Sequence, residues 1–293
     1  MLFRSLMRDG EFELNGYRFG CDNPVTVLGW DTGVREVRSQ DVPRPNAHGL
    51  LFGRDFDDTP EWTFTFRAKD RDFAVAWDRV DEFRTEWQAS QRVGEISTLR
   101  YGLPGRVRKV YGRPRRFSLD GDAASQGITI GRVAGLATFQ LSDPRSFSAD
   151  PSGEVSLTLV PESSGGLVAP LVSPLTTTRR GGVRAGVVDN PGDAPSPVVV
   201  TFYGPVANPK VYGDGWEIGL TGNLAYDETI TVDALGLTVR RQDGANVGGR
   251  LTRGTRLNRA ALAPGSQEIW FTGADATGTA RAVVSWSAAY WSL

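Results

Sequence analysis

Apolar and polar residues alternate along much of this chain, a spacing typical of β-strands. The clearest case is residues 61–67, where Trp62, Phe64 and Phe66 share one face because successive side chains of a strand point to opposite faces. After this segment the apolar spacing changes to steps of three and four, which predicts an amphipathic helix over residues 70–88. We expect the helix to cover the aromatic face of the strand. Its apolar stripe comprises Phe73, Trp77, Val80, Phe83 and Trp87.

The remainder of the first half has weaker patterns. Residues 1–60 are expected to be irregular, except for a tight hairpin turn at Asn15-Gly16. Beyond the helix, turn signals such as Leu103-Pro104-Gly105 separate short segments of strand character. We predict strands at residues 96–101, 106–111, 115–119, 127–130 and 137–141.

The second half is predicted to be β throughout. Residues 151–186 are rich in Ser, Gly, Pro and Thr, which indicates a connector with one candidate strand at residues 155–160. Many short strands separated by turn signals follow, a pattern typical of a β-sandwich or jelly roll. The predicted strands are residues 198–203, 210–212, 216–220, 229–232, 237–241, 268–272 and 281–287. The fold class is therefore mainly β with one amphipathic helix, in domains of residues 1–150 and 187–293.

Composition excludes several classes of protein. The chain has 293 residues and a formal net charge of −1, which fits two domains and argues against a chain-wide nucleic-acid surface. Its longest apolar runs are far shorter than the roughly 20 residues of a membrane-spanning helix, and its charged N-terminus is unlike a signal peptide. We therefore expect no membrane insertion. The content of one cysteine and one histidine suits synthesis in a reducing cytoplasm. The single cysteine, Cys21, allows no intrachain disulfide, and with one histidine, His48, we expect neither a zinc site nor a cofactor.

Catalytic chemistry has little support. His48 lies in a polar loop sequence, and Cys21 has the surroundings of an ordinary small residue. Paired carboxylates are the catalytic scheme that composition leaves open, because a glycosidase needs only two of them. The densest acidic cluster, Asp55, Asp57 and Asp58, stands beside Thr59-Pro60 and has the character of a solvated turn. We expect a protein that is not an enzyme, with a cell-wall glycosidase as the weakest alternative.

A basic stretch stands out between residues 106 and 116. It allows two interpretations: a strip that binds phosphate, or an exposed strand edge whose charges block unwanted pairing or meet acidic residues of a neighbouring subunit. Pro114 favours the edge. Its positive residues are Arg106, Arg108, Lys109, Arg113, Arg115 and Arg116.

Aromatic residues of the second half could stack on sugars. Trp270 and Trp286 lie within predicted strands and are expected in the core. Trp216 follows the turn Gly213-Asp214-Gly215, so it is the tryptophan expected to be exposed and the candidate for sugar stacking.

Taken in order, these segments resemble the distal tail protein of long-tailed bacteriophages, a siphovirus-type minor tail component. The resemblance covers nearly the whole chain and depends on the order and spacing of motifs, each of which is weak alone. The motifs are the strand and helix from Trp62 to Trp87, Tyr111-Gly-Arg-Pro114 with Ala137-Thr-Phe-Gln-Leu-Ser-Asp-Pro144, the connector Gly165-Gly-Leu with Pro170 and Pro174, Asn190-Pro-Gly-Asp-Ala194 leading to residues 197–204, and Ala263-Pro-Gly-Ser-Gln-Glu-Ile-Trp-Phe271.

The resemblance implies a structural protein of the virion tail tip. Six copies would close a ring that joins the tail tube to the tail-tip hub, with an N-terminal belt domain around a channel through which DNA passes. A closed ring needs a heterologous interface between unlike patches of neighbouring subunits. The C-terminal domain would be galectin-like, which does not by itself imply sugar binding. A tail-tip module that binds host cell-wall glycan is the alternative, and the basic stretch would face the channel or the next subunit.

Overall fold

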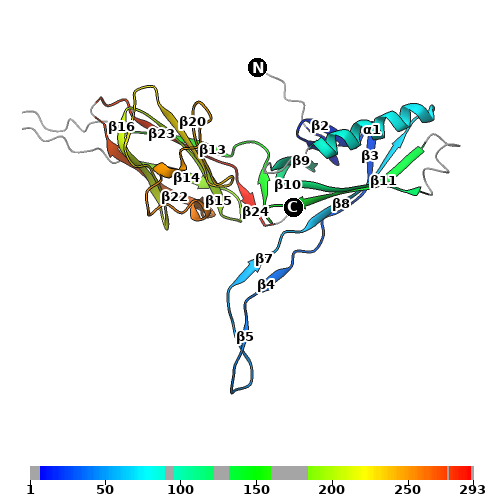
Figure 1. Ribbon diagram of the computed structural model, residues 1–293, viewed down its shortest axis with the longest axis horizontal. Helices are drawn as coiled ribbons and strands as arrows, with labels where there is room; N and C mark the ends of the chain where they lie inside the picture. The colour runs from blue at the N-terminus through cyan, green and yellow to red at the C-terminus, as the bar shows by residue number, and fades with distance from the viewer. Residues whose placement is uncertain (1–6, 90–95, 122–131, 160–183, 276, 292–293) are drawn as a thin grey trace, which may run out of the picture. The chain divides into compact units, whose positions relative to one another are not determined.

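The protein consists of two compact units (Figure 1), and the computed structural model describes residues 7–89, 96–121, 132–159, 184–275 and 277–291. The first unit spans residues 1–149 together with residues 291–293, and the second spans residues 150–290. The described part is mainly β with one α-helix, which confirms the predicted fold class. Within that part no helix has the length and apolar character needed to cross a lipid bilayer.

The first unit is built on one antiparallel sheet with the strand order β2-β1-β9-β10-β11-β8-β3, and the short β12 also pairs with β10. The expectation that residues 1–60 are irregular was wrong, because three strands of this sheet come from them. The bounds are β1 Glu11–Leu14, β2 Tyr17–Gly20, β3 Val25–Asp31, β8 Glu61–Lys69, β9 Ser97–Leu103, β10 Arg106–Leu119, β11 Arg132–Leu141 and β12 Ser146–Ser148.

Turn chemistry sets the two short hairpins of this sheet. Asn15 and Gly16 have φ angles of 49° and 100°, the left-handed backbone that a two-residue turn between β1 and β2 requires. Gly105, with φ of 71°, turns the chain between β9 and β10. Both predicted turns are therefore confirmed.

Strand β10 corrects the prediction for the basic stretch. The two strands predicted at residues 106–111 and 115–119 form a single strand of 14 residues, which pairs with β9 on one side and β11 on the other. It is therefore central, and the edge position that Pro114 favoured was wrong. The register shifts between Pro114 and Phe117, so a bulge at this point accommodates the proline. The strand predicted at residues 127–130 lies outside the described residues.

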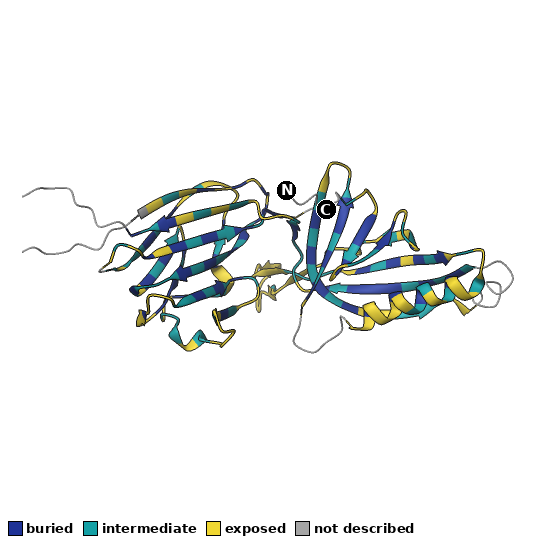
Figure 2. Cartoon of the chain, turned by 90° about the horizontal axis from the view of Figure 1, so that it is seen from above, coloured by how far each residue is buried: buried dark blue, intermediate teal, exposed yellow. Residues whose placement is uncertain are grey.

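Helix α1 (Phe73–Ala89) covers the aromatic face of the sheet, as predicted. It begins after Asp72, whose carboxylate accepts a hydrogen bond of 2.9 Å from the Ala74 amide. The buried stripe faces the sheet, whereas the outward side of the helix is exposed (Figure 2). Phe83 is fully buried, and its ring centroid lies 5.0 Å from that of Phe19 and 5.1 Å from that of Phe66.

The second unit contains two antiparallel sheets with one buried core between their inner faces. One has the order β13-β23-β15-β19-β20 with β21 beside β15, and the other has the order β14-β22-β16-β17 with β18 beside β16. Each strand predicted from residue 198 onward is present. The bounds are β13 Gly153–Thr158, β14 Arg184–Asn190, β15 Ser196–Tyr203, β16 Val206–Gly213, β17 Trp216–Gly219, β18 Asn223–Leu224, β19 Thr229–Asp233, β20 Thr238–Arg241, β21 Ala261–Leu262, β22 Gly265–Ala274, β23 Arg281–Trp286 and β24 Ala289–Tyr290.

The segment expected to be a connector, residues 151–186, contributes to these sheets at both ends. Strand β13 pairs with β23 over its whole length, and β14 begins at Arg184 and pairs with β22. Residues 160–183 lie outside the described residues, and with them the Gly165, Pro170 and Pro174 motif. The Asn190 motif has a structural role, because the buried Asn190 amide donates to the carbonyls of Ala194 and Leu262 at 2.9 and 3.1 Å.

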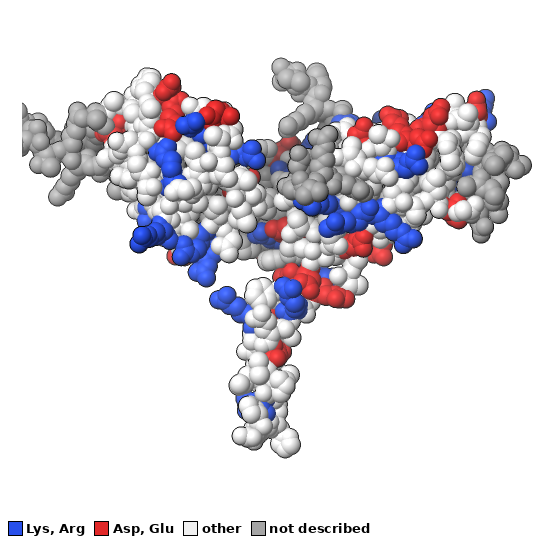
Figure 3. Space-filling view, in the orientation of Figure 1, with Lys and Arg blue, Asp and Glu red and all other residues white. Residues whose placement is uncertain are grey.

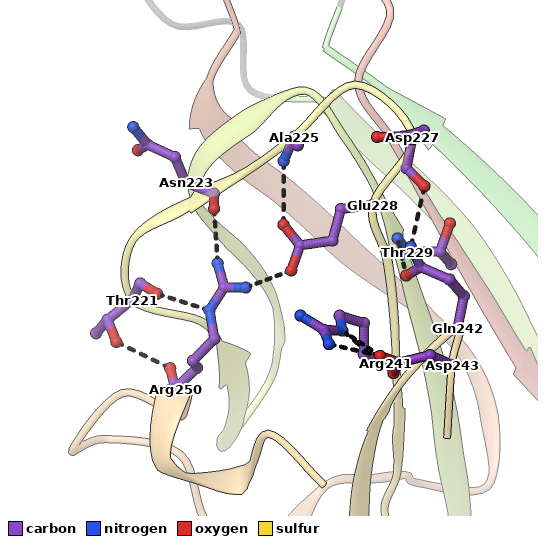
Figure 4. A network of polar contacts seen from close by, with 10 residues as sticks. All are labelled: Thr221, Asn223, Ala225, Asp227, Glu228, Thr229, Arg241, Gln242, Asp243 and Arg250. Atoms are coloured by element: carbon purple, nitrogen blue, oxygen red, sulfur yellow. Dashed lines mark hydrogen bonds and ion pairs between the residues drawn. The ribbon is translucent and has the colours of Figure 1, made fainter. Parts of the chain in front are cut away.

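A polar network around Arg250 holds the loops at one end of the second unit (Figure 4). The Arg250 guanidinium donates to the Glu228 carboxylate at 2.7 Å and to the backbone carbonyls of Asn223 and Thr221 at 2.8 and 3.3 Å. Nearby, hydrogen bonds from the Arg241 guanidinium lower the pKa of Asp243 to about 2. The hydrogen bonds of Arg250 hold the backbone at the start of the loop of residues 251–260.

We expect Phe83→Ala to lower the free energy of unfolding of the first unit by about 3–5 kcal/mol, because a fully buried ring would leave a cavity between helix and sheet. Val75 lies on the same helix and is 38% exposed, so Val75→Ala is the matched control and should change stability by about 0.5 kcal/mol at most. Urea unfolding followed by near-ultraviolet circular dichroism measures both. Equal midpoints for the two variants would contradict the proposed packing.

Candidate functional site

The most exposed feature of the first unit is a long two-stranded hairpin, here called the arm, formed by residues 32–60 between β3 and β8 (Figure 1). Its two strands pair over two short segments. Beyond the first segment the Gln40 amide donates a hydrogen bond to the Arg54 carbonyl, and beyond the second the Arg44 amide donates to the Gly49 carbonyl. The pairs are β4 (Val37–Ser39) with β7 (Asp55–Asp57), and β5 (Val42–Pro43) with β6 (Leu50–Leu51).

The arm has no core of its own. Seven of the fourteen large hydrophobic side chains that are exposed in the described part of the chain belong to it, and Phe52 is 88% exposed. An isolated hairpin is at best marginally stable in water, and contiguous exposed apolar surface marks an interaction site. The arm therefore has the properties of an interaction surface. Its exposed apolar residues are Val34, Val37, Val42, Leu50, Leu51, Phe52 and Phe56.

Charge is concentrated at the base of the arm and sparse over the rest of its surface (Figure 3). The Arg35 guanidinium holds the Asp57 carboxylate with contacts of 2.6 and 2.8 Å and lies 4.6 Å from the centroid of the Trp291 ring. These contacts fasten the arm where it leaves the sheet, and its outer part remains available for packing.

The candidate carboxylates of the glycosidase alternative all lie on this arm. Asp57 pairs with Arg35, and Asp58 pairs with Arg38 at 3.8 Å, so two of the three serve as ion-pair partners. Asp55 is exposed on β7. His48 is an exposed residue of the turn at the tip, as expected of a solvated loop histidine. Within the described residues no cluster of His, Cys, Asp and Glu side chains could hold a metal ion.

The arm is a candidate functional feature that was not predicted from the sequence. Two short apolar pairs, Val42-Pro43 and Leu50-Leu51, flank the turn sequence Arg44-Pro-Asn-Ala-His-Gly49. Such a symmetrical arrangement around a turn is a hairpin signal. It was weak because the runs are only two residues long.

The basic stretch does not form one surface strip, because side chains of a strand alternate between faces. Arg108 points into the buried side of β10 and is 4% exposed, whereas Lys109 and Arg113 lie half-buried on the opposite face. Arg106 precedes them at the start of the strand and is exposed. Arg115 and Arg116 are exposed at the bulge.

Arg108 is a buried structural cation. Its guanidinium donates a hydrogen bond of 3.0 Å to the Ser146 hydroxyl on β12, and it stands opposite Tyr101 in the register of β9 and β10. Burial raises the pKa of the Tyr101 phenol, against the opposing influence of Ser146 and Arg108. The phenol is therefore neutral at physiological pH, and Arg108 is unavailable to a neighbouring subunit or to a channel.

A row of charges crosses the face of the sheet opposite the helix. Arg18, Glu13, Arg100 and Lys109 occupy neighbouring register positions on β2, β1, β9 and β10. The Glu13 carboxylate lies 3.0 Å from Arg18 and 3.4 Å from Arg100, so one acid bridges two strands. Lys109 donates to the Ala149 carbonyl at 3.4 Å. This face is polar, and most of its charges already have partners within the unit.

Trp216 was expected to be exposed, and that expectation was wrong. Its side chain is 6% exposed and belongs to the core of the second unit, because it shares the inward face of β17 with Ile218. The tryptophan that reaches the outer surface is Trp270, which was expected in the core. It is half-buried and stacks on Tyr212, with ring centroids 5.5 Å apart and planes inclined by 19°.

A hollow of about 330 Å³, here called the basic groove, lies beside this aromatic pair. Its lining includes Lys210, Tyr212 and Glu217 from the outward face of β16 and β17, and Arg256 and Arg259 from the following loop. Lys210 forms an ion pair with Glu217 across the two strands. The groove therefore combines an aromatic surface with charged groups of both signs.

Comparisons with solved structures find the same fold in proteins of bacteriophage tails, and 10 solved chains match. The Dit protein of SPP1, described as a paradigm of the hub adsorption apparatus in phages that infect Gram-positive bacteria, matches with a TM-score of 0.56 at 11% identity. A chain of the phage P2 baseplate in its activated conformation with Ca matches with a TM-score of 0.56 at 8% identity.

A chain of the phage p2 baseplate with Sr has a TM-score of 0.54 at 9% identity. Each of the three matches covers 94% of this chain and 97% of the other. No protein-family model and no curated protein matches the sequence. At these identities the likeness concerns the fold, and at that level it confirms the resemblance to phage distal tail proteins.

We expect Arg108→Glu to lower the free energy of unfolding by about 3–5 kcal/mol, because an uncompensated carboxylate would replace a buried cation. Arg115→Glu, an exposed site on the same strand, should change stability by about 0.5 kcal/mol at most. Denaturant midpoints followed by tryptophan fluorescence measure the difference. A loss of the same size at both positions would show that Arg108 is not a structural residue.

Proposed function

We propose that this chain is a structural protein of a bacteriophage tail tip, a distal tail protein that closes a hexameric ring between the end of the tail tube and the tail-tip hub. The observation that carries the proposal is the arm, a hairpin without a core that exposes seven large apolar side chains. The shared fold with tail and baseplate proteins over nearly the whole chain supports the same assignment.

The arm suits a heterologous contact. Its apolar side chains gain stability only when another surface covers them, and each fully buried one contributes about 1.5–3 kcal/mol. In a ring, the arm of one subunit packs on a different surface of the next, so every arm is covered and the assembly closes. The first unit then acts as the belt domain, with the arm as its extension toward the neighbour.

Because Arg108 is buried, it is removed from the set of charged residues proposed for the interface. Arg106, Arg115 and Arg116 are the exposed members of the basic stretch, so these three are the ones proposed to meet a neighbouring subunit or to face the channel. Lys109 and Arg113 contribute from the polar face of the sheet. Through such a channel DNA would pass without sequence-specific contact.

The second unit is proposed to be the galectin-like domain, a docking surface that faces other components of the tail tip. Its partners would be the tail tube protein and the hub protein, and the assembled protein would belong to the virion after synthesis in the cytoplasm of the host bacterium. A structural role requires no cofactor. The pairing of Asp57 and Asp58 with arginines gives the glycosidase alternative no support.

We expect the double variant Leu51→Asp/Phe52→Asp to abolish ring formation, because two charges would have to be buried at the subunit contact. Sedimentation velocity of the full chain should show a hexamer for the native protein and a monomer for the variant. Unchanged far-ultraviolet circular dichroism would establish that the variant is folded.

Leu237→Asp is the matched control, because Leu237 is a large hydrophobic residue of the second unit that is 60% exposed. It should leave the hexamer intact. A hexamer that survives the arm variant would remove the arm from the interface, and a native chain that stays monomeric at every concentration would contradict self-assembly into a ring.

A further inference from the structure

We propose that the basic groove of the second unit is a binding site for an acidic saccharide, a sugar that carries carboxylate or phosphate groups. The groove includes the sugar-stacking position expected at Trp216, which lines it but is only 6% exposed, so Tyr212 rather than Trp216 is the ring proposed to contact a ligand. The proposal concerns a ligand of the isolated chain and does not depend on ring formation.

Tyr212 supplies the more exposed aromatic ring of the groove, and polar groups surround it. Tyr212 lines the groove and stacks on Trp270, and both rings are half-buried on the outward face of the sheet. Half-buried aromatic rings offer apolar faces to the C–H side of a sugar ring, and polar groups beside them orient its hydroxyls. Lys210 lies next to Tyr212, with its ammonium 5.5 Å from the ring centroid. Glu217 stands opposite Tyr212 in the strand register.

The wall of the groove is held in place by the loop that follows Arg250. The Thr255 hydroxyl accepts a hydrogen bond of 3.0 Å from the Gly219 amide, and the Thr252 amide donates to the Gly219 carbonyl at 2.9 Å. The two threonine hydroxyls are also 2.9 Å apart. Because Thr255 is buried, the loop is fastened to β17, and the groove is largely pre-formed.

Two arginines give the groove its selectivity for an anion. The Arg256 guanidinium donates to the backbone carbonyls of Arg253 and Thr255 at 2.7 and 3.0 Å, which fixes its position at the rim. Arg259 is exposed, and in the described part of the chain its side chain has no ion-pair partner. Glu217 is paired with Lys210, so the cations without a carboxylate partner are the arginines. A guanidinium fork matches carboxylate and phosphate geometry, so the ligand should carry such a group.

The size of the groove favours a short saccharide over a nucleic-acid strand. A hollow of about 330 Å³ lies at the lower end of the range for small-molecule sites. A single strand of nucleic acid is usually tracked by a longer positive groove with successive stacking residues. Two cations without a carboxylate partner among the described residues and one half-buried ring, that of Tyr212, fit one or two sugar rings.

Calorimetric titration of the full chain tests the proposal, with trigalacturonate as the carboxylated probe, glucose 6-phosphate as the phosphorylated probe and maltotriose as the neutral one. We expect at least one acidic probe to bind more than about tenfold more tightly than maltotriose, with an affinity that falls as salt rises. The two acidic probes distinguish a carboxylated from a phosphorylated ligand. Inorganic phosphate and a thymidine oligonucleotide complete the set.

Arg259→Gln and Tyr212→Ala should each weaken binding of the acidic saccharide by about tenfold or more, equivalent to about 1.4 kcal/mol. Arg240→Gln, an exposed arginine on β20 of the other sheet, should leave the affinity unchanged. Circular dichroism shows whether Tyr212→Ala is folded. Because Arg259 is exposed, Arg259→Gln should not change the stability of the fold.

Several results would overturn the assignment. If none of the acidic saccharides binds, or if Arg240→Gln weakens binding as much as Arg259→Gln, the groove is not the site. Equal binding of inorganic phosphate would identify an adventitious ion only. Tighter binding of the oligonucleotide would assign the groove to nucleic acid.

Discussion

The aromatic cluster beneath helix α1 is the interaction on which the first unit depends. Phe83 and Trp87 of the helix pack on Phe19, Phe64 and Phe66 of the sheet, with ring centroids 5.0–6.1 Å apart. This contact holds β8 in place, and β8 pairs with β3. Because the arm is the connection between these two strands, the cluster also determines where the arm leaves the sheet. The apolar side chains of the arm are thus positioned by the core of the first unit, but they are not part of that core.

In the second unit, too, the residues that hold the backbone differ from the residues that are exposed for binding. The Arg250 network and the Thr252 and Thr255 hydroxyls hold one loop against β17. That loop presents Arg256 and Arg259 next to Tyr212. Buried or paired polar groups fix the backbone, so the exposed arginines need not be ordered by a ligand. Such pre-organisation lowers the entropic cost of binding.

The two units also differ in how their apolar residues are satisfied. The second unit buries its apolar strand faces between two sheets, and its exposed large hydrophobics are scattered singly. The first unit has one sheet, one helix and an uncovered arm. This asymmetry supports the proposal that the first unit is the part that meets copies of the same chain. It leaves the second unit free to contact other molecules.

The sequence by itself determined the helix, the strand at residues 61–67, the strands from residue 198 onward, the turn at Asn15-Gly16 and the mainly β class, because these follow from local spacing and backbone preference. Tertiary structure decided the rest. Alternation shows that Arg108 and Lys109 point to opposite faces, but only the packed sheet shows which face is buried. The arm and the basic groove escaped prediction for the same reason. Exposure and pairing depend on which distant segments meet, and neighbouring residues carry little information about that.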